Sequence, residues 1–199
     1  MPRTPPSLWS RVEALLDRVE KPAQYAGGEV NQVLKDPRSV EVRVALAFPD
    51  TYAIGMSHLG LRILYGILNE RPDCWAERAF APWTDMERAM RAAGVPLFSL
   101  ESHTPLRAFD ILGFSLSYEL SNTNLLAMLD LAGIPLRRRD RAEDDPLVLA
   151  GGDGAASPEP MADFVDLFLI GDGEDALPAL LDVFKECRQG GLSRRETLL

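Results

Sequence analysis

Residues 109–116 read FDILGFSL, a nearly unbroken apolar run that is typical of a strand covered on both faces of a sheet. Three further runs have the same character: EVRVALAF at 41–48, PLVLA at 146–150 and DLFLI at 166–170. Each run ends in a loop rich in glycine, serine or acidic residues. We expect these four runs to be parallel strands in the centre of one sheet.

Segments with helical periodicity separate the strands, which implies right-handed βαβ units and an open α/β sheet. The sheet should be mostly parallel and have five or six strands, depending on whether a short apolar segment at 97–100 takes part. The other expected elements are a short strand at 77–81 and helices at 58–69, at 84–93, between Ser121 and Gly133, and around Leu177–Phe184.

The chain divides into three parts by this pattern. Residues 1–40 contain a helix at 8–20 and a polar arm that packs on the domain, residues 41–188 form the domain itself, and residues 189–199 are predicted to be a loose tail.

Composition excludes several classes of function. The 199 residues carry a net charge of −9, which argues against a general nucleic-acid binder and against an anionic membrane as partner. No apolar run is long enough to span a membrane, and the N-terminus has no apolar signal core, so we expect a cytoplasmic protein. Two Cys and two His, all far apart, cannot build a structural zinc site or a cysteine-ligated iron–sulfur cluster within this chain.

The loops that follow the strands are the best candidates for a binding site, because ligands of open parallel sheets bind at the carboxyl ends of the strands. These loops are 49–58, 115–121, 151–157 and 171–175. The second begins an unusually dense polar set, of which helix capping needs only one member: Ser115, Ser117, Tyr118, Glu119, Ser121, Asn122 and Asn124.

Individual motifs in these loops have more than one interpretation. GDGEDA at 171–176 matches a dinucleotide fingerprint, but its three carboxylates occupy the place of a pyrophosphate and suit a helix N-terminus instead. Gly151-Gly152 indicates either a tight turn or the close approach of a ligand to the backbone. His58 begins a predicted helix, so a hydrogen bond at the helix start is the default, with a ligand or a switch as alternatives.

Five segments, in matching order, resemble radical SAM proteins that have an N-terminal cobalamin-binding-like domain and are often fused or paired with a small radical-SAM-linked protein. The resemblance spans roughly residues 8–188 and implies a Rossmann-like (flavodoxin-like) three-layer sandwich. The sheet would receive the nucleotide tail of cobalamin at its carboxyl edge, with the corrin over the loops. The segments are VALAFPDTYAIGMSHLGLRILYGILN (44–69), APWTDMERAM (81–90), PLFSLES (96–102), FDILGFSLSYELSNTNLLAMLDLAGIPLR (109–137) and GGDGAASPEPMADFVDLFLIGDGE (151–174).

The resemblance, together with the polar set above, implies cofactor-binding residues on four loops and neither a catalytic residue nor a metal ligand. They are Pro49, Asp50, Thr51, Tyr52, Gly55 and Ser57 in the first loop, Ser115, Ser117, Tyr118 and Glu119 in the second, Gly151 and Gly152 in the third, and Gly171, Gly173 and Glu174 in the fourth.

Two departures from the family pattern bear on the cofactor. Cobalamin domains of the histidine-ligating type carry Asp-x-His-x-x-Gly after the first strand, whereas here Tyr52 follows Asp50 at the histidine position and the nearest histidine is His58. We therefore expect any cobalamin to be base-off and without a histidine ligand. Asp153 follows the double glycine where the family has proline, and its carboxylate weakens the attraction for a phosphate-bearing tail.

Radical SAM chemistry also needs a Cys-x-x-x-Cys-x-x-Cys loop, which these 199 residues lack. The resemblance thus implies that the four-iron cluster and SAM belong to a catalytic domain beyond about residue 200, and that this chain is an N-terminal piece without catalytic activity of its own. Its expected partners are its own or a separately encoded radical SAM domain and a radical-SAM-linked protein.

Two other functions stay open. One is a cofactor-free structural or interaction module of the same family, and the other is an independent enzyme such as a flavin protein. A cofactor site requires an open, polar cleft above Ser115 and Gly151, whereas in a purely structural module side chains would fill that space.

Overall fold

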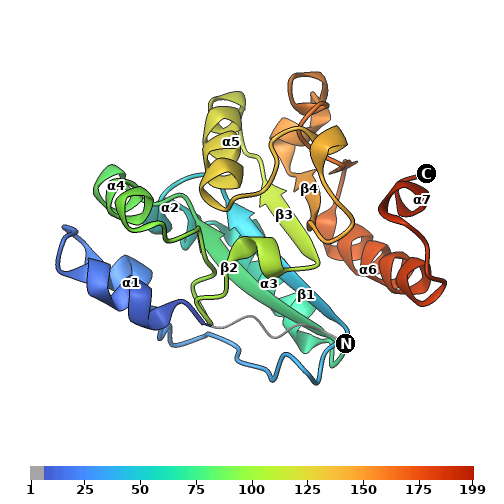
Figure 1. Cartoon of the computed structure of the whole chain (residues 1–199). Helices are drawn as coiled ribbons and strands as arrows, with labels where there is room; N and C mark the ends of the chain where they lie inside the picture. The colour runs from blue at the N-terminus through green and yellow to red at the C-terminus, as the bar shows by residue number, and fades with distance from the viewer. Residues whose placement is uncertain (1–6) are drawn as a thin grey trace.

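Within residues 7–199, which the computed structural model describes, five strands form one sheet in the order β2-β1-β3-β4-β5. Every strand pair is parallel, so the predicted α/β sheet is confirmed, and the carboxyl ends of the strands share one edge (Figure 1). The strands are β1 (Val42–Phe48), β2 (Cys74–Phe80), β3 (Ile111–Ser115), β4 (Leu147–Gly151) and β5 (Leu167–Leu169).

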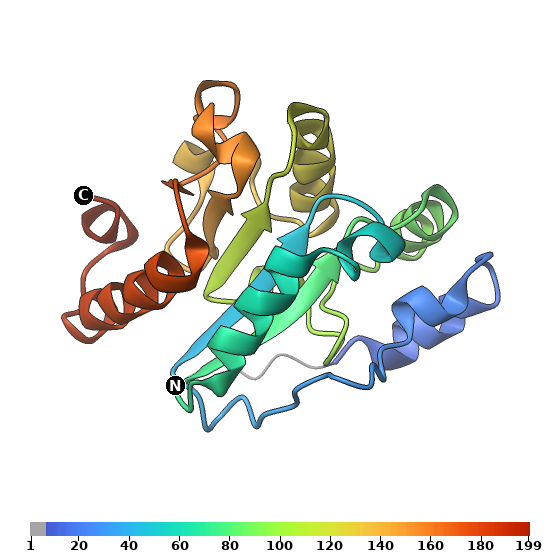
Figure 2. The same ribbon diagram turned by 180° about the vertical axis from the view of Figure 1, so that it is seen from behind.

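Helices cover both faces of the sheet and complete the predicted three-layer sandwich (Figure 1, Figure 2). Helices α3 (Leu59–Glu70) and α6 (Gly173–Gln189) pack on one face, and α1 (Trp9–Leu16), α4 (Thr84–Ala93) and α5 (Asn122–Leu131) pack on the other. The short elements are α2 (Tyr52–Gly55), α7 (Arg194–Thr197) and the 3₁₀ turns η1 (Pro22–Tyr25), η2 (Leu106–Ala108), η3 (Glu119–Ser121), η4 (Arg138–Asp140), η5 (Asp153–Ala156) and η6 (Glu159–Met161).

Strand β3 is the centre of the sheet, with β1 on one side and β4 on the other. The side chains of Ile111, Leu112 and Phe114 are at most 2% exposed, although they point to opposite faces. Burial on both faces explains why this stretch is apolar throughout instead of alternating between apolar and polar residues.

Three strand predictions need correction. The sequence predicts that β5 is central, but it is an edge strand that pairs with β4 alone and is only half-buried. Residues 97–100 are not a strand but part of a loop with a single bridge between Phe98 and Pro105. Strand β2 begins at Cys74 and not at 77, because it pairs with β1 from Val42 onward. Hydrophobic patterns report which side chains are buried, whereas strand order follows from how the layers pack.

The segment at 189–199, predicted to be a loose tail, ends in helix α7. Arg194 of this helix forms an ion pair of 2.5 Å with the buried carboxylate of Asp166 and donates a hydrogen bond of 2.7 Å to the carbonyl of Asp145. Ser193 and Glu196 form a capping box that defines the start of α7. The tail is therefore held by charge pairing, which its polar composition does not reveal.

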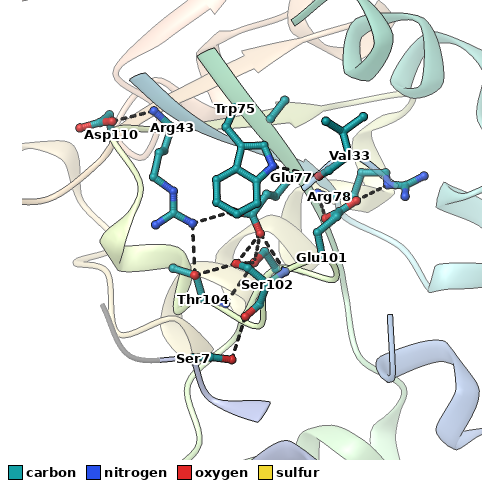
Figure 3. Close-up of polar contacts among 12 residues, drawn as sticks. Ser7, Val33, Arg43, Trp75, Glu77, Arg78, Glu101, Ser102, Thr104 and Asp110 are labelled. Carbon is teal, nitrogen blue, oxygen red and sulfur yellow. Dashed lines mark hydrogen bonds and ion pairs between the residues drawn. The ribbon is translucent and has the colours of Figure 1, made fainter. Parts of the chain in front are cut away.

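The outer side of β2 carries a buried network of charged side chains (Figure 3). Glu77 is fully buried, and its Oε1 forms an ion pair with the guanidinium of Arg43 of β1, at 2.5 Å. The second oxygen of Glu77 accepts hydrogen bonds from the hydroxyl of Ser99 at 2.8 Å and from the backbone N–H of Ser102 at 3.0 Å. Glu77 thereby fixes the loop that follows α4 against the edge of the sheet.

The next residue of β2 holds the same loop from the opposite face. The guanidinium of Arg78 pairs with Glu101 at 2.6 Å and lies 4.3 Å from the ring centre of Tyr65 on α3. Burial raises the pKa of Glu101 to about 7, against the lowering effect of Arg78. The N–H of Leu100 also donates to the carbonyl of Arg78 at 2.7 Å, so the loop covers backbone groups that an edge strand would otherwise expose.

We expect Phe114→Asp to prevent folding, because an unpaired carboxylate in a strand covered on both faces costs roughly several kcal/mol. Phe114→Leu is the control, since it keeps the site apolar and should lower the free energy of unfolding by less than about 1.5 kcal/mol. Circular dichroism during urea denaturation measures both. Cooperative unfolding of Phe114→Asp near the wild-type midpoint would show that β3 is not the buried centre.

Removing one partner of the Arg43–Glu77 pair should cost more than removing both. Glu77→Leu leaves a buried guanidinium without its counter-charge, and we expect a loss of about 3–5 kcal/mol in the free energy of unfolding. The double variant Arg43→Met with Glu77→Leu should regain the part of this loss that comes from the unpaired guanidinium, while Ser99 and Ser102 still lack their acceptor. Urea denaturation of wild type, Arg43→Met, Glu77→Leu and the double variant gives the coupling energy between the two residues. Strictly additive losses in the free energy of unfolding would contradict this prediction.

Candidate functional site

A cleft of about 230 Å³ opens at the carboxyl edge of the sheet, between the strands and the helices α3 and α6. Its floor consists of the apolar side chains of Leu46, Leu149 and Leu177. The other lining residues are His58, Gly60, Leu64, Gly113, Phe114, Ser115, Leu116, Ser117, Ala150, Gly151, Gly152, Asp153, Leu169, Gly171, Gly173 and Glu174.

Glycine residues, which have no side chain, leave the space of the cleft open. Gly113 lies within β3, and a Cβ atom added there would have Leu46 as its nearest neighbour, at 3.9 Å. A Cβ atom at this position would make only ordinary van der Waals contact, and the side chain that it begins would project into the cleft. Gly60 and Gly173 lie in the first turns of α3 and α6, where they keep these helix ends narrow. Glycine within a strand often marks such a close approach of another group.

The mouth of the cleft is polar and of mixed character. The hydroxyls of Ser115 and Ser117 border it, as do the exposed carboxylates of Asp153 and Glu174. Helix α6 begins without a side-chain cap, so the N–H groups of its first turn have no partner within the helix and favour an anion. The two carboxylates oppose that preference, which leaves a mouth suited to a ligand held by hydrogen bonds.

The double glycine has a structural reason of its own. Gly152 has φ +91°, and a Cβ atom there would come within 2.7 Å of the carbonyl oxygen of Leu116. Leu116 in turn donates to the carbonyl of Gly151 at 2.8 Å and accepts from Gly154 at 2.9 Å. The tight turn therefore requires Gly152, and the same turn places Gly151 and Gly152 on the wall of the cleft.

The structure brings together about half of the residues that the sequence proposes for the site. Seven line the cleft: Ser115, Ser117, Gly151, Gly152, Gly171, Gly173 and Glu174. Eight lie outside its lining: Pro49, Asp50, Thr51, Tyr52, Gly55, Ser57, Tyr118 and Glu119.

The residues outside the cleft shape the loops around it. Tyr118 donates to Asp50 at 3.2 Å, which links the loops after β3 and β1. Tyr52 donates to Glu29 of the N-terminal arm at 2.5 Å. Gly55 lies against the ring of Phe80, and a Cβ atom there would be 2.4 Å from it, so glycine at this position serves packing.

Among the lining residues that the sequence does not propose for the site, Gly113 and His58 matter most to its chemistry. Gly113 could have been found, because a glycine inside an otherwise apolar strand is a known signal of close approach. His58 was placed by its spacing at the start of a helix, and that prediction is confirmed: its Nδ1 accepts a hydrogen bond of 3.2 Å from the N–H of Leu61. The sequence does not show that the same imidazole also lines the cleft.

Exposed apolar side chains follow four of the five strands at the carboxyl edge of the sheet. Ile54 follows β1, Trp83 follows β2, Tyr118 and Leu120 follow β3, and Ile170 follows β5. We call these five residues the apolar rim. Each is between 44% and 82% exposed, and all five lie on loops at the same edge of the sheet as the cleft.

A second cleft, of about 380 Å³, lies at the opposite edge of the sheet, between α6, α7 and the loop before β4. Its lining has both signs of charge, including Asp110, Asp145, Arg188 and Arg194. It is away from the carboxyl ends of the strands, and several of its side chains pair with one another or with neighbouring groups, so we do not regard it as the site.

The fold and the cleft define an α/β domain with an open parallel sheet and a cleft at its carboxyl edge. A family model described as "Radical SAM proteins, N-terminal" matches residues 60–199, more than half of the chain. The chain therefore belongs to this family and is an N-terminal domain of the radical SAM type. We found no matching curated protein and no matching solved structure.

Residues 7–199 contain neither a metal-binding cluster nor a membrane-spanning helix. This part of the chain has no cluster of three or more His, Cys, Asp or Glu side chains that could hold a metal ion. It also has no helix with the length and apolarity that crossing a bilayer requires.

We expect this chain to assemble no iron–sulfur cluster by itself. Its sequence has only Cys74 and Cys187, and burial raises the pKa of the Cys74 thiol to about 12, so it does not supply the thiolate that iron binds. Anaerobic reconstitution with iron and sulfide, followed by iron analysis and visible spectroscopy, measures this. Cys187→Ser is the control for iron held by the more accessible thiol, and stoichiometric iron with a charge-transfer band would contradict the prediction.

Proposed function

We propose that this domain binds a cobalamin-type cofactor by its nucleotide tail and holds it for a radical SAM catalytic domain. The observation that carries the proposal is the open part of the cleft over Gly113. It lies at the point where the strand order reverses between β1 and β3. Open α/β sheets bind their ligands at such switch points.

The dimensions of the cleft fit part of such a cofactor. Sites that enclose a whole drug-sized ligand measure roughly 300–1,000 Å³, so a cleft of about 230 Å³ suits one end of a larger molecule. The apolar floor at Leu46 and Leu149 suits a heteroaromatic base, and the hydroxyls of Ser115 and Ser117 suit the polar groups that follow it. The macrocycle would remain outside, over the apolar rim.

The residues present would bind and position the cofactor and would leave the chemistry to it. When bound, cobalamin supplies a cobalt centre that carries a transferable methyl group. The serine hydroxyls and the uncapped N-terminus of α6 orient the tail, while the apolar rim keeps water from the face above the loops. We place the iron–sulfur cluster and SAM in the catalytic domain, which would cover the apolar rim, and we expect the protein to be cytoplasmic.

A second candidate function is a cofactor-free module that docks on the catalytic domain. The observation in its favour is the pair of carboxylates, Asp153 and Glu174, at the mouth, which repel a phosphate. The open cleft supports cofactor binding instead, because a module selected only for docking gains from filling this space with side chains.

Filling the cleft over Gly113 with a side chain tests the proposed cobalamin binding. Gly113→Val places a branched side chain in the cleft and suits a strand, so we expect the protein to fold while its affinity for hydroxocobalamin falls about ten- to a hundred-fold. Titration of the purified domain, followed in the visible spectrum, measures the affinity. The wild-type complex should show a base-off spectrum without a nitrogen ligand from the protein.

Gly66→Val is the matched control, because Gly66 lies on α3 with no atom within 4 Å of the added Cβ and is not part of the cleft. It should bind as wild type does. Gly152 is unsuitable for this test, since any side chain there would disrupt the turn. If the folded wild-type domain binds no cobalamin, the module function replaces our proposal.

A further inference from the structure

We propose that His58 is the residue that recognises the phosphate of the bound tail, by donating a hydrogen bond from its Nε2, and that it is not a ligand of the metal. This inference rests on the proposed function and assigns a specificity-determining residue to that same cleft. It concerns an imidazole that lines the cleft wall at the start of α3.

The cap of α3 fixes the tautomer of His58. Nδ1 accepts a hydrogen bond of 3.2 Å from the backbone N–H of Leu61, so this nitrogen must present its lone pair and carry no proton. In a neutral imidazole the proton is then on Nε2. Among residues 7–199, no group accepts a hydrogen bond from that N–H, which leaves it as the free donor of the ring.

Packing fixes the position of the ring. The imidazole lies 4.9 Å from the ring centre of Phe48, at the end of β1. On the other side it lies over Gly60, where an added Cβ would be 3.2 Å from Cε1 of the ring. The glycine lets the ring lie close to the first turn of α3, so the donor is held in place before a ligand arrives.

The surrounding charges explain why a donor is needed at this point. The carboxylates of Asp153 and Glu174 at the same mouth accept hydrogen bonds when ionised and donate none. A phosphate diester, which also only accepts, therefore depends on the other groups of the cleft. His58 adds a fixed N–H donor to the hydroxyls of Ser115 and Ser117.

The same geometry argues against metal ligation. Coordination through Nδ1 would remove the cap from α3, and coordination through Nε2 would move the imidazole proton to Nδ1, which could then no longer accept the N–H of Leu61. Nδ1 therefore stabilises the start of α3 as a hydrogen-bond acceptor, and Nε2 is left to donate to the ligand.

The test separates these two roles by substitution. His58→Ser keeps an oxygen that can accept the N–H of Leu61, as serine commonly does at helix starts, but loses the Nε2 donor. His58→Ala loses both. We expect His58→Ser to have a melting temperature close to wild type and His58→Ala a lower one, while both bind hydroxocobalamin about ten- to a hundred-fold more weakly. The visible spectrum of bound cobalamin should be the same in all three proteins.

Nitrogen NMR of the ligand-free domain tests the tautomer independently, with His58→Ser assigning the signals against His103. We expect Nδ1 of His58 to be unprotonated and Nε2 to be protonated. The reverse tautomer, a wild-type affinity in His58→Ser, or a nitrogen-ligated cobalt spectrum lost in that variant would each overturn the role of His58. If wild type itself fails to bind hydroxocobalamin, the proposed function fails and the role of His58 with it, and the wild-type titration alone identifies this case.

Discussion

The structure depends on the pairing of β1 with β3, two strands between which β2 intervenes in the sequence. Val44 is opposite Ile111 and Ala47 is opposite Phe114, so the two strands run side by side through the centre of the sheet. The chain leaves β1 towards one face, through α3, and leaves β3 towards the other face, through α5. The two crossovers therefore lie on opposite faces, and although Tyr118 and Asp50 join the loops at the edge, Gly113 leaves open space on the face that carries α3.

The two edges of the sheet use buried charge to hold the segments that cover them. At β2, Glu77 and Arg78 fix the loop that contains Ser99 and Glu101. At the other edge Asp166, which precedes β5, pairs with Arg141 at 2.9 Å and with Arg194 of α7. Buried ion pairs contribute little net stability compared with apolar contacts, but removing one partner is costly. Their effect here is to specify one docking geometry and to shield edges that could pair with another chain.

Most of the candidate site consists of residues that the fold itself requires. Its apolar floor belongs to the core, its turn at Gly152 is demanded by backbone geometry, and the N-terminus of α6 supplies unpaired N–H groups. His58 both caps a helix and lines the cleft. These groups can hold a ligand in place by hydrogen bonds and apolar contact, and the proposed function assigns them no more than that.

The sequence by itself determined the class of fold, most element positions and the sheet edge at which the cleft opens. These follow from local causes: continuous apolar runs predict doubly covered strands, helical periodicity predicts the crossovers, and glycine-rich loops mark the carboxyl ends. It also predicted that His58 begins a helix. Half of the proposed site residues, Ser115 and Gly151 among them, do line the cleft.

Only the tertiary structure decided which loops meet. The loop that contains Asp50 and Tyr52 follows a central strand, yet its polar groups bond to Tyr118 and to Glu29 and turn away from the cleft. The edge position of β5, the docking of Arg194 and the second role of His58 depend on contacts between residues far apart in the chain. Such contacts have no periodicity and no fixed spacing, so no local pattern in the sequence encodes them.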